Sequence, residues 1–516
     1  MSLTRREFLW ATAAASLSFP ALAQEHRETA AAGTRFQHGV ASGDPLLDRL
    51  IIWTRVTPRD PSSTRPIQLR WRVGTDAELR SVVSSGTAET SGERDYTVKV
   101  DVGGLTPGRP YFYAFDVEGE QSPVGRTKTF PATSDRMRFA LVSCSNFPAG
   151  YFNVYAAIAR RPELDAVVHV GDYIYEFAEG EYGAGAAINR IPQPAHEAIA
   201  LADYRARYAT YRTDPDLQEA HRLFPFIAVW DDHELANDAW ANGAINHNPE
   251  KGEGDWATRR AAAYKAYLEW MPIRESSDPA IHLYRVIRFG TLADLVMLDT
   301  RALRDRQVAN SDAAGLADPK RTLMGAAQEA WMFDQLRASQ RAGTSWTLLG
   351  QQTMFSSITL PGTRPTNTDQ WDGYPAQRER VLDFIERERI RNVVILAGDA
   401  HSSWGFDVPR HPWNGYRAES GAGSLAVELV TPAISSPPPP MFTSSSGSDA
   451  AAALRVAFPH LKYLEGAHRG FILLELTPNR MKANWVFSPD VRVRSDAEIT
   501  GASFVCDRGS AHLQAG

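Results

Sequence analysis

Residues 166–175 read AVVHVGDYIY, an uninterrupted apolar run followed by Gly171-Asp172 and then by Tyr175. A continuous apolar run without alternation is typical of a strand buried on both faces. Ligands of α/β sheets bind beyond the carboxyl ends of such strands. An unpaired carboxylate would be costly there, which favours a functional role for Asp172. The segment predicts an α/β sheet with a polar site at its strand ends.

Five further segments between residues 136 and 401 repeat this pattern, and each ends on polar residues. They are Phe139–Val142 before Ser143-Cys144-Ser145, Phe226–Trp230 before Asp231-Asp232-His233, Asp294–Leu298 before Asp299-Thr300-Arg301, Trp346–Leu349 before Gly350-Gln351-Gln352, and Val393–Leu396 before the Asp399-Ala400-His401 turn. Helical stretches fit between them, at 151–160, 203–210, 255–270, 326–338 and 376–387. Two more strands, at 470–476 and 481–487, are expected to complete an α/β domain over residues 136–500.

Residues 36–130 have a different pattern, with short, mostly alternating runs separated by turn residues. The runs are Leu50–Val56, Ile67–Val73, Tyr96–Val100 and Arg109–Phe115. This spacing predicts an N-terminal Ig-like β-sandwich domain. Such a domain more often positions its neighbour than performs chemistry.

The first 23 residues predict export. Arg5-Arg6 precede a short apolar, alanine-rich run, and Ala21-Leu22-Ala23 supplies a small-x-small cleavage site. The run is too short to span a bilayer. Paired arginines indicate a twin-arginine signal and its export machinery, with an ordinary secretory signal as the alternative. Either signal predicts a periplasmic or secreted protein.

Charge and composition restrict the partners. The formal net charge is −6, so no general attraction to nucleic acid or anionic membranes is expected. No later segment is long and apolar enough to span a membrane. The serine- and proline-rich residues 435–448 are expected to form a surface loop. The chain has two cysteines, Cys144 and Cys506, and a disulfide between them is the alternative to a metal-binding role for Cys144.

The strand ends together carry the groups of a metal site: Cys144, Asp172, Tyr175, Asp232, His233, Asp399 and His401. A phenolate or thiolate with carboxylates suits a hard ion such as Fe(III), and additional carboxylates suit calcium, magnesium or manganese. Two adjacent metal ions can hold a phosphate between them and activate a water molecule. The residue set therefore predicts hydrolysis of a phosphoester.

Each residue also has a structural interpretation. A buried cysteine is usually a small hydrophobe, and Tyr175 could simply pack its ring. Only one of Asp231 and Asp232 is expected to bind metal, and the other could cap a helix or orient His233. Arg301 could bind a phosphate oxygen or form a structural ion pair.

The chain resembles the alkaline phosphatase D (PhoD) family, a branch of the calcineurin-like and purple-acid-phosphatase-like metallophosphoesterases. The resemblance rests on residues 38–45 (HGVASGDP), the Ser143-Cys144-Ser145 turn, and the segments 171–176, 230–234, 371–375 and 398–401. It implies an N-terminal sandwich followed by a four-layer α/β/β/α catalytic domain. It also implies one ferric ion and one or more calcium ions.

The resemblance assigns roles by motif. Cys144, Tyr175 and His401 would hold the ferric ion, Asp172 would bridge the metals, and Asp232 and Asp399 would face calcium. Wider relatives have Asn and His where this chain has Asp232 and Asp399, a change that favours calcium over zinc. Other divalent metals remain possible.

The expected function is that of a metal-dependent phosphomonoesterase or phosphodiesterase. A metal-activated water would attack phosphorus, and His233 would assist the leaving group. The substrate could be a small phosphoester, a phospholipid or a polymer. Two rival hypotheses are a metal-holding protein that binds phosphate or phosphoesters without turnover, and a purely structural role for the metals.

Overall fold

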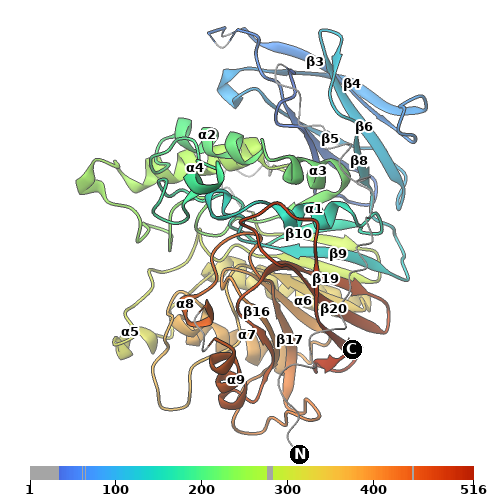
Figure 1. The fold of residues 1–516 in the computed structure, drawn as a ribbon. Helices are drawn as coiled ribbons and strands as arrows, with labels where there is room; N and C mark the ends of the chain where they lie inside the picture. Colours follow the sequence, from blue (N-terminus) through green and yellow to red (C-terminus); the bar gives the residue numbers. More distant parts are fainter. Residues whose placement is uncertain (1–33, 61, 64, 276–282, 444–446) are drawn as a thin grey trace, which may run out of the picture.

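The computed structural model describes residues 34–60, 62–63, 65–275, 283–443 and 447–516, and the expected signal segment lies outside them. The described strands form three sheets (Figure 1). Ten strands lie in the order β22-β21-β20-β19-β9-β10-β11-β1-β2-β5, and seven in the order β12-β13-β14-β15-β17-β16-β18. The third sheet has the order β4-β3-β6-β7, with β8 paired to β6.

The ten-stranded sheet contains the strands expected around the first three polar turns. Its members are β1 (Val40–Gly43), β2 (Leu50–Arg55), β5 (Thr97–Val102), β9 (Met137–Val142), β10 (Ala166–His169), β11 (Pro225–Ala228), β19 (Arg469–Leu476), β20 (Arg480–Ser488), β21 (Ile499–Asp507) and β22 (Gln514–Ala515). Strands β9, β10 and β11 run parallel. Their carboxyl ends therefore lie at one edge.

The seven-stranded sheet carries the other three polar turns. Its members are β12 (Arg285–Phe289), β13 (Ala293–Met297), β14 (Trp346–Gly350), β15 (Val393–Ala397), β16 (Ser403–Pro409), β17 (Ser424–Val430) and β18 (Leu461–Glu465). Strands β13, β14, β15 and β17 are parallel. Alternate side chains face opposite ways: Leu295 and Met297 enter the core shared with the first sheet, whereas Val296 packs into a second core with α6 and α7.

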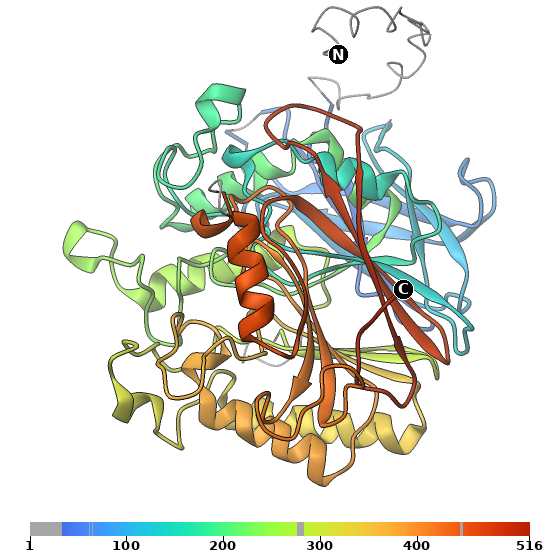
Figure 2. The ribbon, with the colours of Figure 1, turned by 60° about the horizontal axis from the view of Figure 1, so that its bottom comes forward.

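Helices cover the outer faces of the two sheets and complete the α/β/β/α layers. Helices α1 (Asn153–Ala159), α2 (Leu201–Tyr211), α3 (Pro215–Leu223) and α4 (Trp256–Trp270) lie on the side of the first sheet; α6 (Gly325–Ala342) and α7 (Pro375–Arg387) lie on the second, at the bottom of Figure 2. The shorter helices are α5 (Ala313–Leu316), α8 (Pro440–Thr443) and α9 (Gly447–Ala457). All five expected helices are present, with ends shifted by a few residues.

The N-terminal region is an antiparallel sheet packed against the end of the ten-stranded sheet. It comprises β3 (Ile67–Gly74), β4 (Val82–Thr90), β6 (Pro110–Val117), β7 (Glu120–Gln121) and β8 (Gly125–Lys128). A hydrophobic cluster joins it to β1, β2 and β5. Strand β1 pairs with β11 in parallel, and a Cβ at Gly43 would lie 2.6 Å from the Phe226 carbonyl oxygen. One layer of the expected sandwich over 36–130 is thus continuous with the larger domain.

The serine- and proline-rich segment differs from its expected form. The surface loop expected at 435–448 is present only in part: Ser435 and Ser436 are 1% and 0% exposed, most of the described residues after them are at least partly exposed, and α8 and α9 occupy part of the segment. Both cysteines are free, which excludes a disulfide between Cys144 and Cys506 in this structure. Among the described residues, no helix combines the length and apolarity that a membrane crossing requires.

Candidate metal centre

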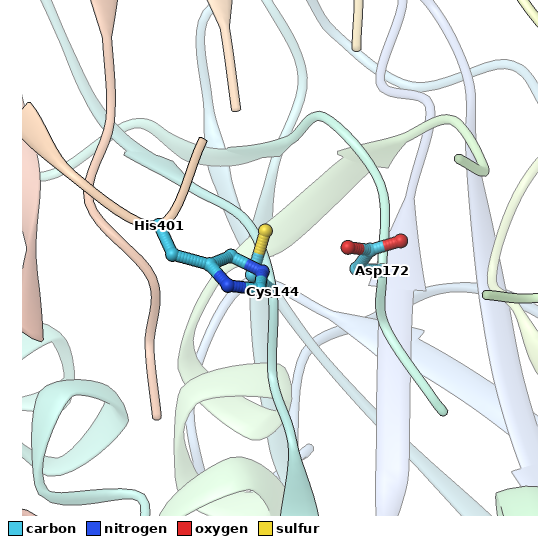
Figure 3. Close-up of side chains that lie close together, drawn as sticks. All are labelled: Cys144, Asp172 and His401. Carbon is cyan, nitrogen blue, oxygen red and sulfur yellow. The ribbon is translucent and has the colours of Figure 1, made fainter. Parts of the chain in front are cut away.

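The six predicted ligands lie together at the facing strand ends. Cys144 follows β9, Asp172 and Tyr175 follow β10, Asp232 follows β11, and Asp399 and His401 follow β15. Figure 3 shows Cys144, Asp172 and His401 converging from separate strands, and one potential ligand atom from each lies within 4.8 Å of the others. Asp172, Asp232 and His233 form a second such group, and Asp231, Asp232 and Asp399 a third.

Tyr175 connects the first group. Its phenol oxygen Oη lies 3.0 Å from Asp172 Oδ2 and 3.1 Å from His401 Nε2. Its ring is 1% exposed and stacks on His233, with 4.2 Å between the ring centroids. Tyr175 therefore presents its oxygen, rather than its ring alone, to the cluster.

The backbone at these turns adopts a conformation that L-residues rarely occupy. Cys144, Asp172, Asp399 and His401 have φ values of 61°, 58°, 61° and 50°. Each left-handed residue other than glycine costs on the order of 1 kcal/mol or more. Gly171, at φ +112°, could not be replaced freely, because an added Cβ would lie 2.4 Å from Asp231 Cβ. Four of the six predicted ligands thus occupy strained positions, as functional residues often do.

Glu234 holds two of the turns in place. Its carboxylate accepts backbone N–H bonds from Asp172 at 3.1 Å, Tyr173 at 2.6 Å and Asp231 at 2.8 Å. Burial raises its pKa to about 7 against the opposing effect of these hydrogen bonds. This supporting role of Glu234 was not predicted from the sequence, although Glu234 directly follows the Asp-Asp-His motif.

The electrostatics of the cluster favour the binding of a cation. Burial, followed by the repulsion of neighbouring acids, raises the pKa of Asp172 well above its ordinary value, although His233 opposes the shift. Burial and the Asp172 charge likewise raise the pKa values of the Cys144 thiol and the Tyr175 phenol. Three buried carboxylate oxygens, Asp172 Oδ1, Asp231 Oδ2 and Asp232 Oδ1, have no hydrogen-bond partner. A cation would satisfy these oxygens and displace the protons.

His401 is suited to bind metal through Nε2. Burial, assisted by the charge on His233, lowers its pKa to about 4, so the imidazole is neutral. Its Nδ1 lies 3.0 Å from the Pro437 carbonyl oxygen and 3.0 Å from the Tyr182 hydroxyl. An Nδ1–H donated to the carbonyl fixes the tautomer that leaves Nε2 free for a metal.

His233 lies in the same cleft with a buried carboxylate behind it. Its Nδ1 lies 2.8 Å from Glu176 Oε2, and Glu176 is 0% exposed. Burial disfavours the charged imidazole, but Asp232, Glu176 and Asp172 outweigh burial and raise the pKa of His233 well above its usual value. Nδ1 is therefore a donor to Glu176, which leaves Nε2 for a ligand in the cleft.

Arg301 lies behind the acidic groups. It is 1% exposed, donates Nε–H to Asp231 and Nη1–H to Asp369 at 2.9 Å, and places Nη2 3.4 Å from Asp399 Oδ1. Asp232 Oδ1 is 3.7 Å from Nη2. Arg301 is absent from the residues that line the cleft. This placement favours the ion-pair alternative over direct contact with phosphate.

The cleft above the cluster has a volume of about 230 Å³. Its lining residues are Asp172, Phe177, Tyr182, Asp232, His233, Asn237, Asp238, Asp399 and His401. Phe177, Tyr182 and Asp238 were not predicted, because no strand-end position or motif distinguishes them in the sequence. Glu176 could have been predicted as a site residue, because it belongs to the 171–176 segment that follows β10.

Fold and site together define the class of the protein: a two-sheet α/β/β/α scaffold with a candidate metal centre between the strand ends. The chain belongs to the PhoD-like phosphatase family, whose model matches residues 139–485, and the model of the family's N-terminal domain matches residues 21–131. It is 37% identical to alkaline phosphatase D of Bacillus subtilis (strain 168) over 499 residues, 93% of this chain and 82% of that protein. It also matches a solved structure titled "Structure of PhoD", with a TM-score of 0.83, 34% identity, and coverage of 94% of this chain and 92% of that one. The resemblance and the fold expected from it are confirmed.

Proposed function

We propose that this phosphatase is an exported enzyme that hydrolyses phosphomonoesters or phosphodiesters with a mixed ferric and calcium centre. The observation that carries the proposal is the convergence of thiol, phenol, imidazole and carboxylate groups at the strand ends beneath one cleft, where three buried carboxylate oxygens accept no hydrogen bond. The family supports the phosphatase activity. The metal identities, the residue roles and the export route are the proposal.

The donor set divides between two kinds of ion. Cys144, Tyr175 and His401 would hold Fe(III), a combination of anionic and imidazole donors that suits a trivalent ion. Asp232 and Asp399 would hold calcium, which prefers carboxylate oxygens, and Asp172 would be shared. When bound, such ions polarise the phosphate oxygens and lower the pKa of a coordinated water.

His233 is the residue proposed to handle the leaving group. Glu176 fixes the ring through Nδ1 at 2.8 Å, and its carboxylate contributes to raising the pKa of the imidazole. Nε2 can then donate its proton to the oxygen that leaves phosphorus. Arg301 contributes indirectly. Its ion pairs with Asp231, Asp369 and Asp399 offset the repulsion among these carboxylates and hold them in place beside the cleft.

The test combines metal analysis with two substrates on one sample. We expect iron and calcium in the purified protein, a visible charge-transfer band, and hydrolysis of p-nitrophenyl phosphate or bis-p-nitrophenyl phosphate. A colourless protein that contains only zinc would refute the ferric assignment. Activity against the monoester and diester on the same sample decides which bond the cleft prefers.

Export is tested separately. The Arg5-Arg6 pair and the Ala21-Leu22-Ala23 site support the proposal of a twin-arginine signal. Replacement of both arginines by lysine should leave the protein uncleaved in the cytoplasm. Normal export of that variant would point instead to the ordinary secretory route.

A further inference from the structure

The segment that follows β17, buried from Ala433 to Ser436, supports all three residues proposed to bind the ferric ion. Ser143 and Ala433 form a parallel bridge, and Ile434 N–H donates to the Ser143 carbonyl at 2.9 Å. Ser436 N–H donates to the Cys144 carbonyl at 3.3 Å, and the next carbonyl, that of Pro437, accepts from His401 Nδ1 at 3.0 Å. Residues 433–437, here termed the crossing segment, therefore join the two sheets at the site.

The crossing segment also reaches the third residue. Ser436 Oγ donates to Tyr175 Oη at 2.7 Å, and both side chains are at most 1% exposed. The same hydroxyl lies 3.1 Å from the Cys144 carbonyl, its other possible acceptor. A serine hydroxyl has one proton. A phenolate accepts more strongly than a neutral carbonyl, so the shorter bond is favoured once Tyr175 has lost its proton to a metal.

We propose that Ser436 tunes the ferric centre by donating a hydrogen bond to the metal-binding phenolate of Tyr175. This inference rests on the proposed function. Ser436 contacts neither substrate nor the reacting atoms, and it acts through Tyr175 as a positioning residue. Hydrogen bonds to a ligand atom withdraw electron density from it and change both the colour and the redox potential of the metal.

The direction of the effect follows from the chemistry. In a phenolate-to-iron charge-transfer transition, an electron moves from the phenolate to Fe(III). A hydrogen bond stabilises the negative oxygen before the transition more than the neutralised oxygen after it. The bond therefore raises the transition energy. Its removal should shift the band to longer wavelength and lower the Fe(III)/Fe(II) potential.

The chain provides a matched control beside Ser436. Ser435 is also buried, at 1% exposed, but its hydroxyl donates to the Asn146 carbonyl at 2.7 Å and not to Tyr175. Ser435→Ala and Ser436→Ala remove the same atom from adjacent positions in one segment. A general loosening of the crossing segment should affect both variants alike.

The experiment is visible absorption and resonance Raman spectroscopy of the iron-loaded proteins. Ser436→Ala should shift the band to longer wavelength by roughly 10–30 nm, the scale set by a hydrogen bond to a charged oxygen. Ser435→Ala should leave the band in place, and Ser436→Thr, which keeps the hydroxyl, should restore most of the wild-type position. Phenolate ring vibrations should be enhanced in the wild-type spectrum and absent in Tyr175→Phe.

The possible failures are distinguishable. If the wild type lacks a band with phenolate vibrations, the ferric assignment of the proposed function fails. If that band is present but Ser436→Ala leaves it unmoved, or moves it no more than Ser435→Ala does, the inference about Ser436 is wrong while the ferric site stands. Iron content measured on each sample separates a shifted band from a lost ion.

Discussion

Replacement of His233 tests the mechanism most directly. If His233 donates a proton to the leaving oxygen, His233→Gln should reduce kcat/KM for an alkyl phosphate by about 10²–10⁴-fold, equivalent to about 3–5 kcal/mol in the activation barrier. p-Nitrophenolate leaves without help from an acid. For p-nitrophenyl phosphate the loss should therefore be about tenfold or less.

A variant of Glu176 should show a smaller loss of rate than His233→Gln and provides a comparison with it. Glu176→Gln keeps the shape of the side chain but removes the charge that meets His233 Nδ1 at 2.8 Å. A hydrogen bond to a charged group contributes about 1.5–3 kcal/mol, so the loss for the alkyl phosphate should be about 10–150-fold. It should again be smaller for the nitrophenyl ester.

The assay is steady-state kinetics with both substrates for the wild type and the two variants. Circular dichroism and metal content must match the wild type before the rates are compared. Equal losses with the two leaving groups would refute proton donation and would indicate that His233 only positions phosphate or a ligand. An unaffected His233→Gln enzyme would contradict any role for the ring in turnover.

The remaining predictions concern the metal site and stability. Tyr175→Phe should lose the visible band and weaken iron retention, as measured by absorption and elemental analysis; a full band would exclude the phenolate as its source. Arg301→Met should destabilise the metal-free protein by about 3–5 kcal/mol, because it leaves buried acids unpaired. The loss of stability should be smaller in the metal-loaded protein, and urea unfolding with and without calcium measures both values. Burial lowers the pKa of His460 to about 4, so below about pH 6.5 the unfolded state binds the proton that the folded state refuses. Stability should fall as the pH drops from about 6.5 to 4, by about 1.4 kcal/mol per unit from this residue, and His460→Gln should reduce that slope in melting curves at a series of pH values.

The strand ends were predictable because two local signals coincide there. A run such as 166–170 is too apolar for a surface strand, and an acid directly after it needs a partner. Parallel strands then bring their ends together without further information. The same logic located Cys144, Asp232 and Asp399, which lie far apart in sequence.

The supporting residues were not predictable in this way. Ser436 lies in a serine- and proline-rich stretch whose composition indicates a loop, and only the bridge between Ser143 and Ala433 makes it part of the core. Arg301 was placed at the correct strand end, but its choice between phosphate and carboxylates depends on tertiary packing. The N-terminal strands were also recognised as strands, whereas their continuity with the larger sheet depends on the pairing of β1 with β11.

The strained backbone and the unpartnered oxygens suggest how folding and metal binding are linked. The proposed ligands, from Cys144 to His401, meet only when both sheets have formed, so the unfolded chain offers no equivalent site. Before an ion binds, the folded chain must therefore keep acids buried, which raises the pKa of Asp172. It must also keep several residues in the left-handed backbone conformation. A metal that binds only the folded state stabilises it in proportion to RT ln(1 + [L]/Kd), which offsets these costs. An export route for folded proteins would let this binding take place before the protein leaves the cytoplasm, and the proposed twin-arginine signal is consistent with that order of events.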